Sequence, residues 1–264
     1  MITKTKIFKV KARSIFTRTK IPGAKWVINQ YVGCQHFCLY CYAKFMCRWR
    51  PESYGKWGSW VEVKTNAPEL VKGKYVDGWV YMSSVSDPYQ PIEKQLELTR
   101  EVLKNLDKRI KLSILTKSDL ILRDIDILKR FENLEVGLTI NSFDAKLKKV
   151  FEPFSPTNQA RIYALKVLKE NGLKTYSFVS PIIPGLIDIR NIIRQTRDFT
   201  DFYWFEMLNL RLAGQEFIKI IKRKFPKGFE IMSDKAKFNN FLKECRLVIN
   251  SEKINCRGIE IHRW

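Results

Sequence analysis

Short apolar runs rich in β-branched and aromatic residues alternate with segments of helical periodicity between residues 26 and 208. The runs cover residues 26–32, 79–84, 111–116, 134–140, 174–180 and 202–208. Between them, apolar residues recur three or four positions apart, most clearly over 92–107, 120–131, 157–171 and 188–200. Strands separated by helices pair in parallel through right-handed crossovers. The sequence therefore predicts an α/β domain of six strand–helix units.

The alternation stops on both sides of this core, so we expect three regions. Residues 1–25 contain eight Lys and Arg and no acidic residue, which predicts a basic N-terminal arm. Residues 26–215 form the core domain, and a chain that is 45% hydrophobic is long enough to build it. Residues 216–264 predict a small C-terminal α/β cap, with helices at 218–225 and 234–248 and a strand at 258–262.

Three cysteines are grouped in the loop that follows the first predicted strand: Cys34, Cys38 and Cys41. The C-x3-C-x2-C spacing brings three thiolates together and leaves a fourth coordination position unfilled by nearby sequence. Thiolates are the usual ligands of iron–sulfur clusters, and a cluster held by three of them has one iron free to bind a reacting molecule. The alternative is a structural zinc site with a fourth ligand from elsewhere in the chain. Its candidates are Cys47, Cys245, Cys256, His36 and His262.

Five segments, taken in order, carry a family resemblance. The first is the cysteine loop at 31–43, in which Tyr40 precedes the third cysteine. The others are Ser-Val-Ser-Asp-Pro-Tyr-Gln-Pro at 84–91, Leu-Thr-Lys-Ser at 115–118, Leu-Thr-Ile-Asn at 138–141, and Phe-Glu-Pro at 151–153 followed by Arg161. Together they resemble the radical S-adenosylmethionine (SAM) superfamily, and within it the branch that contains spore photoproduct lyase. The resemblance implies a partial (β/α)6 TIM-type barrel.

The resemblance also implies the cofactors. A 4Fe–4S cluster on the three cysteines leaves one iron to bind the methionyl amine and carboxylate of SAM. One electron from a reductant such as ferredoxin or flavodoxin then splits the sulfonium and gives a 5′-deoxyadenosyl radical. The protein has to place the cofactor, orient its 5′ carbon at a substrate hydrogen and exclude competing reactions.

Polar residues at the predicted strand ends are the candidates for binding SAM, because chemistry in a parallel barrel gathers where strands end. On the family resemblance, Ser84, Ser86 and Asp87 are expected to accept hydrogen bonds from the methionyl ammonium. Lys117 and Arg161 are expected to pair with the carboxylate. The alternative for the Ser and Asp positions is turn chemistry, since these side chains bond local backbone.

Further candidates follow from the same resemblance. Thr139 and Asn141 are expected to hold ribose hydroxyls, and Tyr40 to lie along the adenine or the cluster. Tyr40 and Tyr42 match tyrosines that the lyase uses near its cluster. The lyase has a cysteine that returns a hydrogen atom to the repaired thymine where this chain has Ser84. An O–H bond is too strong for that transfer, so the lyase reaction itself is in question. The catalytic candidates are Tyr42, which matches a lyase tyrosine, and Ser84, which stands at the position of the lyase cysteine.

The charge points to a polyanionic partner. Lys and Arg number 48 against 27 Asp and Glu, giving a net charge of +21, and such a field attracts nucleic acid. Between residues 42 and 61, aromatic residues interleave with cations, which predicts a platform for stacked bases. A nucleic acid, DNA or RNA, is therefore the expected substrate. The alternatives are a radical enzyme that modifies a protein or small molecule, and a nucleic-acid-binding protein without enzymatic activity whose cysteines hold zinc.

No apolar run approaches the roughly 18 residues of a membrane span, and the N-terminus lacks the apolar stretch of a signal peptide. We therefore expect a cytoplasmic protein without a membrane partner. Six cysteines, three of them bunched, suit a reducing compartment better than a disulfide framework.

Overall fold

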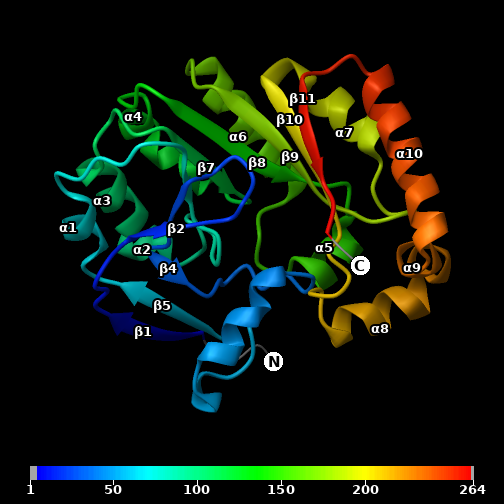
Figure 1. Ribbon diagram of the computed structural model, residues 1–264, viewed down its shortest axis with the longest axis horizontal. Coiled ribbons are helices and arrows are strands. Elements are labelled where there is room, and N and C mark those ends of the chain that lie inside the picture. Colours follow the sequence, from blue (N-terminus) through cyan, green and yellow to red (C-terminus); the bar gives the residue numbers. More distant parts are fainter. Residues whose placement is uncertain (1–4, 263–264) are drawn as a thin grey trace.

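A computed structural model describes residues 5–262, and its largest element is a curved sheet of eight strands (Figure 1). The order along the sheet is β11-β10-β9-β8-β7-β6-β3-β2, and all neighbours are parallel except β2 and β3. The strands are β2 (Phe16–Arg18), β3 (Trp26–Ile28), β6 (Val80–Met82), β7 (Leu112–Thr116), β8 (Leu134–Ile140), β9 (Thr175–Ile182), β10 (Phe202–Met207) and β11 (Cys256–Glu260). Within the described chain the two edge strands β2 and β11 do not pair, so the partial barrel that was predicted is confirmed.

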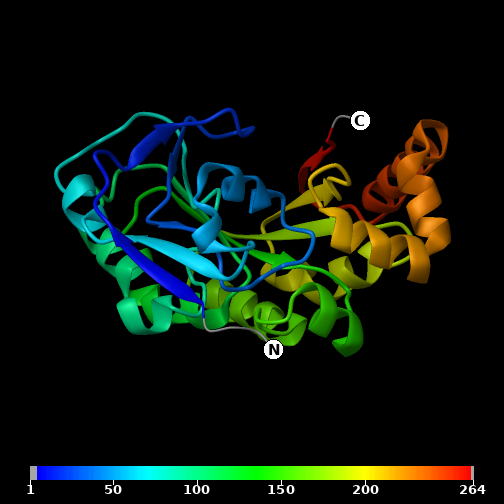
Figure 2. The ribbon, with the colours of Figure 1, turned by 90° about the horizontal axis from the view of Figure 1, so that it is seen from below.

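Helices connect successive strands and cover one side of the sheet. In Figure 2 the green helices lie below the sheet. The α-helices of the core are α1 (Ala67–Val71), α2 (Glu93–Leu96), α3 (Leu98–Asn105), α4 (Ile125–Leu128), α5 (Ala145–Phe151), α6 (Asn158–Glu170) and α7 (Ile189–Thr196). Short 3₁₀ helices are η1 (Tyr42–Trp49), η2 (Glu52–Tyr54), η3 (Asp119–Asp124) and η4 (Arg197–Phe199).

Local chemistry sets where these helices begin and break. The side chains of Thr157 and Asp188 accept hydrogen bonds from the first turns of α6 and α7, as N-cap residues do. The single helix expected over 92–107 is divided into α2 and α3, because Glu97 adopts the left-handed conformation with φ 49°. Such a conformation ends a helical run.

A second, smaller sheet uses part of the basic N-terminal segment. Its order is β1-β5-β4, formed by β1 (Lys6–Val10), β5 (Trp60–Lys64) and β4 (Tyr31–Val32). Strand β2 of the same segment pairs with β3 in the main sheet. Residues 5–25 are therefore built into both sheets, while residues 1–4 of the expected arm lie outside the described residues. The small sheet holds the start of the cysteine loop, which follows β4 directly.

The C-terminal extension also joins the core. It consists of α8 (Gln215–Lys224), α9 (Pro226–Ser233), α10 (Lys235–Ser251) and β11, which pairs in parallel with β10. Phe217 and Ile221 of α8 pack against Leu39 and Tyr40 of the cysteine loop. The extension thus adds a seventh parallel strand, and its helix α8 packs against the cysteine loop. None of the helices in residues 5–262 has the length and apolar character required to cross a bilayer.

Candidate active site

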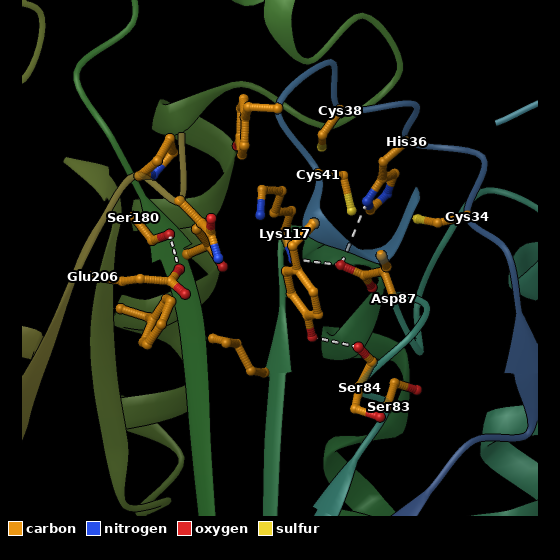
Figure 3. Close-up of a pocket in the computed structure, with 18 of the residues that line it drawn as sticks. Cys34, His36, Cys38, Cys41, Ser83, Ser84, Asp87, Lys117, Ser180 and Glu206 are labelled. Atoms are coloured by element: carbon orange, nitrogen blue, oxygen red, sulfur yellow. Dashed lines mark hydrogen bonds and ion pairs between the residues drawn. The ribbon is translucent and has the colours of Figure 1, made fainter. Parts of the chain in front are cut away.

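A pocket lies between the cysteine loop and the carboxyl ends of the parallel strands (Figure 3). Most of the residues expected at a site line it: Cys34, Cys38, Tyr40, Cys41, Tyr42, Ser84, Ser86, Asp87, Lys117 and Thr139. Asn141 and Arg161 are outside the lining. The fold therefore gathers residues that are as much as 105 positions apart in the sequence, from Cys34 to Thr139.

The cysteine loop turns tightly because of its backbone. Gly33 has φ +88°, and a Cβ there would lie 2.5 Å from the carbonyl oxygen of Trp60, so only glycine fits between β4 and the loop. The Phe37 amide bonds the Cys34 carbonyl at 3.4 Å, and the Cys41 amide bonds the Cys38 carbonyl at 3.2 Å. All three cysteines are free thiols facing the same pocket.

Burial and charge affect the ionisation of the three thiols. Burial raises the pKa of Cys34, and nearby charges of Asp87, Cys38 and Cys41 raise it further, so metal is needed to stabilise the thiolates. Within residues 5–262, no three His, Cys, Asp or Glu side chains are placed to hold one metal ion. A four-iron cluster binds each cysteine through a different iron and so accepts thiolates that are spaced around a cavity.

Asp87 links the cysteine loop to the ends of β6 and β7. One carboxylate oxygen accepts hydrogen bonds from Thr116 Oγ1 at 2.6 Å and the Tyr89 amide at 2.9 Å. The other accepts from the Lys117 amide at 2.9 Å and lies 3.4 Å from His36 Nδ1. Burial alone would raise the pKa of Asp87, but the charge and hydrogen bond of His36 and the bonds from Thr116 and Lys117 lower it to about 2. The carboxylate is thus ionised and already satisfied by the protein.

Lys117 extends its ammonium into the centre of the pocket (Figure 3). Its Nζ lies 6.0 Å from the centre of the Tyr40 ring, and no hydrogen bond from this ammonium is found within residues 5–262. Burial by itself lowers the pKa of Lys117, but the charges of Cys38 and Glu152 outweigh burial and the pKa is raised. Lys117 is therefore a cation available to an anionic group in the pocket.

Behind the pocket wall, Glu152 is the centre of a fully buried network. It accepts hydrogen bonds from the Tyr40 hydroxyl, from Asn141 Nδ2 at 3.0 Å and from the Arg161 guanidinium. Arg161 also donates to the Thr139 carbonyl at 3.1 Å. Asn141 and Arg161 therefore hold Tyr40 and the end of β8 in place, and they do not project into the pocket. The sequence contained Glu152 within a motif but gave no sign of this role.

Tyr42 and Ser84 meet in the lining of the pocket. The Tyr42 hydroxyl donates to the carbonyl oxygen of Ser84. Asn29 fixes Ser84 from the other side, donating from Nδ2 to its hydroxyl at 3.1 Å and accepting from its amide at 2.8 Å. The Ser86 hydroxyl likewise donates a hydrogen bond to the Gly33 carbonyl at 2.9 Å. The two catalytic candidates are therefore adjacent.

The aromatic–cationic segment divides into a buried part and an exposed part. Trp57 and Trp60 are 4% and 0% exposed and pack in a cluster with Cys34. Trp49 and Tyr42 are 71% and 41% exposed. The predicted platform for bases is thus limited to the exposed rings, because the two buried tryptophans pack the core.

The side of the pocket away from Cys34 carries polar residues that the sequence pattern did not single out: Ser180, Glu206, Asn209 and His262. Their only sequence signal is that they follow or end strands whose neighbours carry the recognised motifs. The pairing of β11 with β10, which places His262 here, is not visible in the sequence.

The chain is similar to several known proteins. A model of the radical SAM superfamily matches residues 28–194. The uncharacterised protein MJ0683 of Methanocaldococcus jannaschii is 56% identical over 262 residues, 99% of this chain and 100% of the relative. The uncharacterised protein ORF301 of Acidianus two-tailed virus is 29% identical over 214 residues, 74% of this chain and 70% of the relative.

Among solved structures, spore photoproduct lyase complexed with dinucleoside spore photoproduct aligns with a TM-score of 0.67 and 16% identity. The alignment covers 97% of this chain and 82% of the lyase. A variant of the lyase with bound AdoMet and dinucleoside spore photoproduct aligns with a TM-score of 0.65 and 17% identity, over the same shares of both chains. At this identity the likeness shows a shared fold.

Proposed function

Because this chain belongs to the radical SAM superfamily, we propose that it carries out a radical reaction on a base of a nucleic acid. Membership makes it a radical enzyme that depends on an iron–sulfur cluster and SAM. When bound, the cluster and SAM supply a 5′-deoxyadenosyl radical that takes a hydrogen atom from the substrate. The observation that carries the proposal is one pocket that unites three cysteines, Lys117 and the exposed ring of Tyr42.

We assign Cys34, Cys38 and Cys41 as the ligands of a 4Fe–4S cluster. The Lys117 ammonium is assigned to the carboxylate of SAM, because it is cationic and lies in the pocket without a hydrogen bond from the described protein. Thr139 lines the pocket at the end of β8 and is assigned to the ribose.

The other cofactor candidates act by position. Asp87 has four partners on its two oxygens, so it holds the cysteine loop against β7. The hydroxyls of Ser84 and Ser86 form hydrogen bonds within the protein. Both residues line the pocket, so we assign them to its shape. Arg161 and Asn141 hold Tyr40 through Glu152, and Tyr40 in turn faces the pocket beside Lys117.

Charge and exposed rings support a nucleic acid as substrate. Five exposed basic residues of the C-terminal extension lie close together in sequence: Lys219, Lys222, Arg223, Lys224 and Lys227. Trp49 is exposed on η1, the helix that follows the cysteine loop. Cations that hold phosphates beside rings that stack on bases are the usual means of binding single strands. The lyase with the same fold was solved with a dinucleoside lesion, which is consistent with this substrate class.

The cluster assignment is tested by single substitutions of the cysteines under anaerobic reconstitution. Changing Cys34, Cys38 or Cys41 to Ala should abolish retention of cluster iron and reductive cleavage of SAM. The matched controls are Cys47→Ala, Cys245→Ala and Cys256→Ala, which should retain both. Iron and sulfide in near-equal amounts are expected; stoichiometric zinc instead would support the structural-zinc alternative.

The substrate class is tested by incubating the reconstituted protein with SAM, a one-electron reductant such as flavodoxin or ferredoxin, and DNA or RNA. Formation of 5′-deoxyadenosine should increase when the nucleic acid is present and a base should be altered. If neither DNA nor RNA changes the rate and a protein or small molecule does, the nucleic-acid proposal is wrong and the alternative radical enzyme is correct.

A further inference from the structure

The pocket has a second polar wall that the proposed cofactor binding leaves unused. Ser180 lies in β9, Glu206 lies in β10 and His262 follows β11, so three neighbouring strands bring them together. Figure 3 shows Ser180 and Glu206 across the pocket from Cys34 and Asp87, with Lys117 between the two sides. The C-terminal extension, through His262, therefore contributes to the site.

The register of β11 explains how His262 reaches the pocket. Glu206 pairs with Glu260 across the two parallel strands. Side chains alternate between the faces of a strand, so the residue two positions beyond Glu260 returns to the same face. His262 thus stands beside Glu206, and both line the pocket.

Two donors hold the Glu206 carboxylate. Ser180 Oγ donates to Oε2 at 2.5 Å, and His262 Nε2 donates to Oε1 at 3.1 Å. Within residues 5–262 no Lys or Arg forms an ion pair with Glu206. Its side chain is 22% exposed and that of His262 is 27% exposed. Each carboxylate oxygen therefore keeps a lone pair for a further donor, and a molecule in the pocket can reach both residues.

We propose that Glu206 and His262 recognise the hydrogen-bonding edge of the substrate base. The inference rests on the proposed function, since it concerns the same pocket. A carboxylate oxygen accepts from an N–H group, and the second ring nitrogen of His262 is left to bond an adjacent group. The Watson–Crick edge of a nucleobase presents neighbouring donors and acceptors, and enzymes that extrude a base read this edge by hydrogen bonds.

The position of the pair favours the substrate over the cofactor. The cysteine side of the pocket is assigned to the cluster, and Lys117 to the carboxylate of SAM. The opposite side is left for a second molecule. Glu206 is poorly suited to phosphate, because a carboxylate repels it, so the group that enters here is a base and the phosphates remain outside.

The experiment measures base recognition separately from phosphate binding. The probes are four single-stranded DNA nonamers that differ only in the central base and a fifth with an abasic site at that position. Affinity is measured anaerobically for the reconstituted protein with SAM. At least one base should bind about tenfold tighter than the abasic strand, as one hydrogen bond to a charged group would give.

Glu206→Gln and His262→Asn should each reduce this ratio to near one, while the affinity for the abasic strand stays the same. The matched control is Glu260→Gln, which removes a neighbouring carboxylate outside the pocket lining and should keep the tenfold ratio. His262 lies beyond the last strand, so its substitution is expected to leave the fold intact even if Glu206→Gln is poorly folded.

Two results would overturn the inference while leaving the proposed function standing. One is a base-to-abasic ratio that persists in both variants. The other is loss, in Glu206→Gln, of the change that SAM produces in the electron paramagnetic resonance spectrum of the reduced cluster, which would assign the carboxylate to the cofactor. Failure of the native protein to bind any of the five strands, whether made as DNA or as RNA, would instead refute the nucleic-acid proposal, and the recognition pair with it.

Discussion

Replacing Glu152 by Leu should unfold the protein more easily and loosen the cysteine loop. Glu152 is 0% exposed, as is Arg161, and the carboxylate also receives the hydroxyl of Tyr40 and the amide of Asn141. Removing one partner of a buried ion pair leaves the other charge uncompensated, which costs about 3–5 kcal/mol. For a chain of this size that corresponds to a fall in melting temperature of roughly 6–20 °C.

The assay is chemical denaturation of Glu152→Leu beside two comparison variants. Glu230→Leu removes the carboxylate of an exposed ion pair with Lys237 and should cost at most about 1 kcal/mol. The double variant Glu152→Leu/Arg161→Met should be less destabilised than Glu152→Leu alone, because it removes both buried charges. Iron retained after reconstitution should fall in Glu152→Leu, since Tyr40 stands between two cluster cysteines and loses its anchor.

The pH dependence follows from the same residue. Burial raises the pKa of Glu152, but the charges of Arg161 and Lys117 and the hydrogen bonds it accepts lower it to about 2 from an ordinary value of 4.5. The contribution to stability is therefore fully present above about pH 4.5 and is lost as the pH falls through about 2. The stability advantage of the native protein over Glu152→Leu should shrink over that interval. A Glu152→Leu variant no less stable than Glu230→Leu at neutral pH would refute the reasoning.

Three further outcomes are expected. Given a spore-photoproduct dinucleotide, the native protein should release little repaired thymine dinucleotide for each 5′-deoxyadenosine that it forms. Ser84→Cys should raise this ratio, because an S–H hydrogen transfers readily to a carbon radical. Tight coupling of the two products in the native protein would contradict this. The hydrogen bond to Glu206 raises the pKa of His262, so the pair stabilises the fold below about pH 6.5 and this is lost as the pH rises through the raised pKa; in an NMR titration Glu206→Gln should lower that pKa, and an unchanged value would exclude the bond. The logarithm of the binding constant for single-stranded DNA should fall by about 0.7 for each tenfold rise in salt concentration and each phosphate contact. If Trp49 stacks on bases, Trp49→Ala should weaken binding without changing this salt dependence. A changed salt dependence, or no effect on affinity, would show that Trp49 does not stack on bases.

The central strands of the main sheet were predictable because they are buried on both sides. All seven residues of β8 are buried, so that strand appears in the sequence as a continuous apolar run bounded by turns. The small sheet was not predictable for the opposite reason. Strand β1 includes Lys6 and Lys9, and β5 includes Glu62, so their polar residues hide the strand pattern within a segment that reads as basic and irregular.

The parts of the site that are built from residues close together in the sequence were predictable. The parts that are built from distant segments were not. The three cysteines lie within eight positions, and Asp87 and Lys117 lie in the segments that follow two consecutive strands of the main sheet, β6 and β7. The buried pair of Arg161 with Glu152 could not be predicted, because it is revealed only by the packing of α5 and α6 against β8. Likewise Glu206 and His262 are 56 positions apart, and only the register of β11 brings them together.

The distribution of charge indicates which part of a nucleic acid would enter the pocket. The net charge is +21, yet carboxylates line the pocket: Asp87 is ionised beside His36, and Glu206 has no Lys or Arg ion pair among residues 5–262. A positive exterior concentrates phosphates on the surface, and carboxylates inside keep them out of the pocket. A base has no net charge and can enter. Making the interior less acidic, as in Glu206→Gln, should therefore weaken discrimination between a base and a free phosphate, and inorganic phosphate should become a better competitor for the strand in that variant than in the native protein.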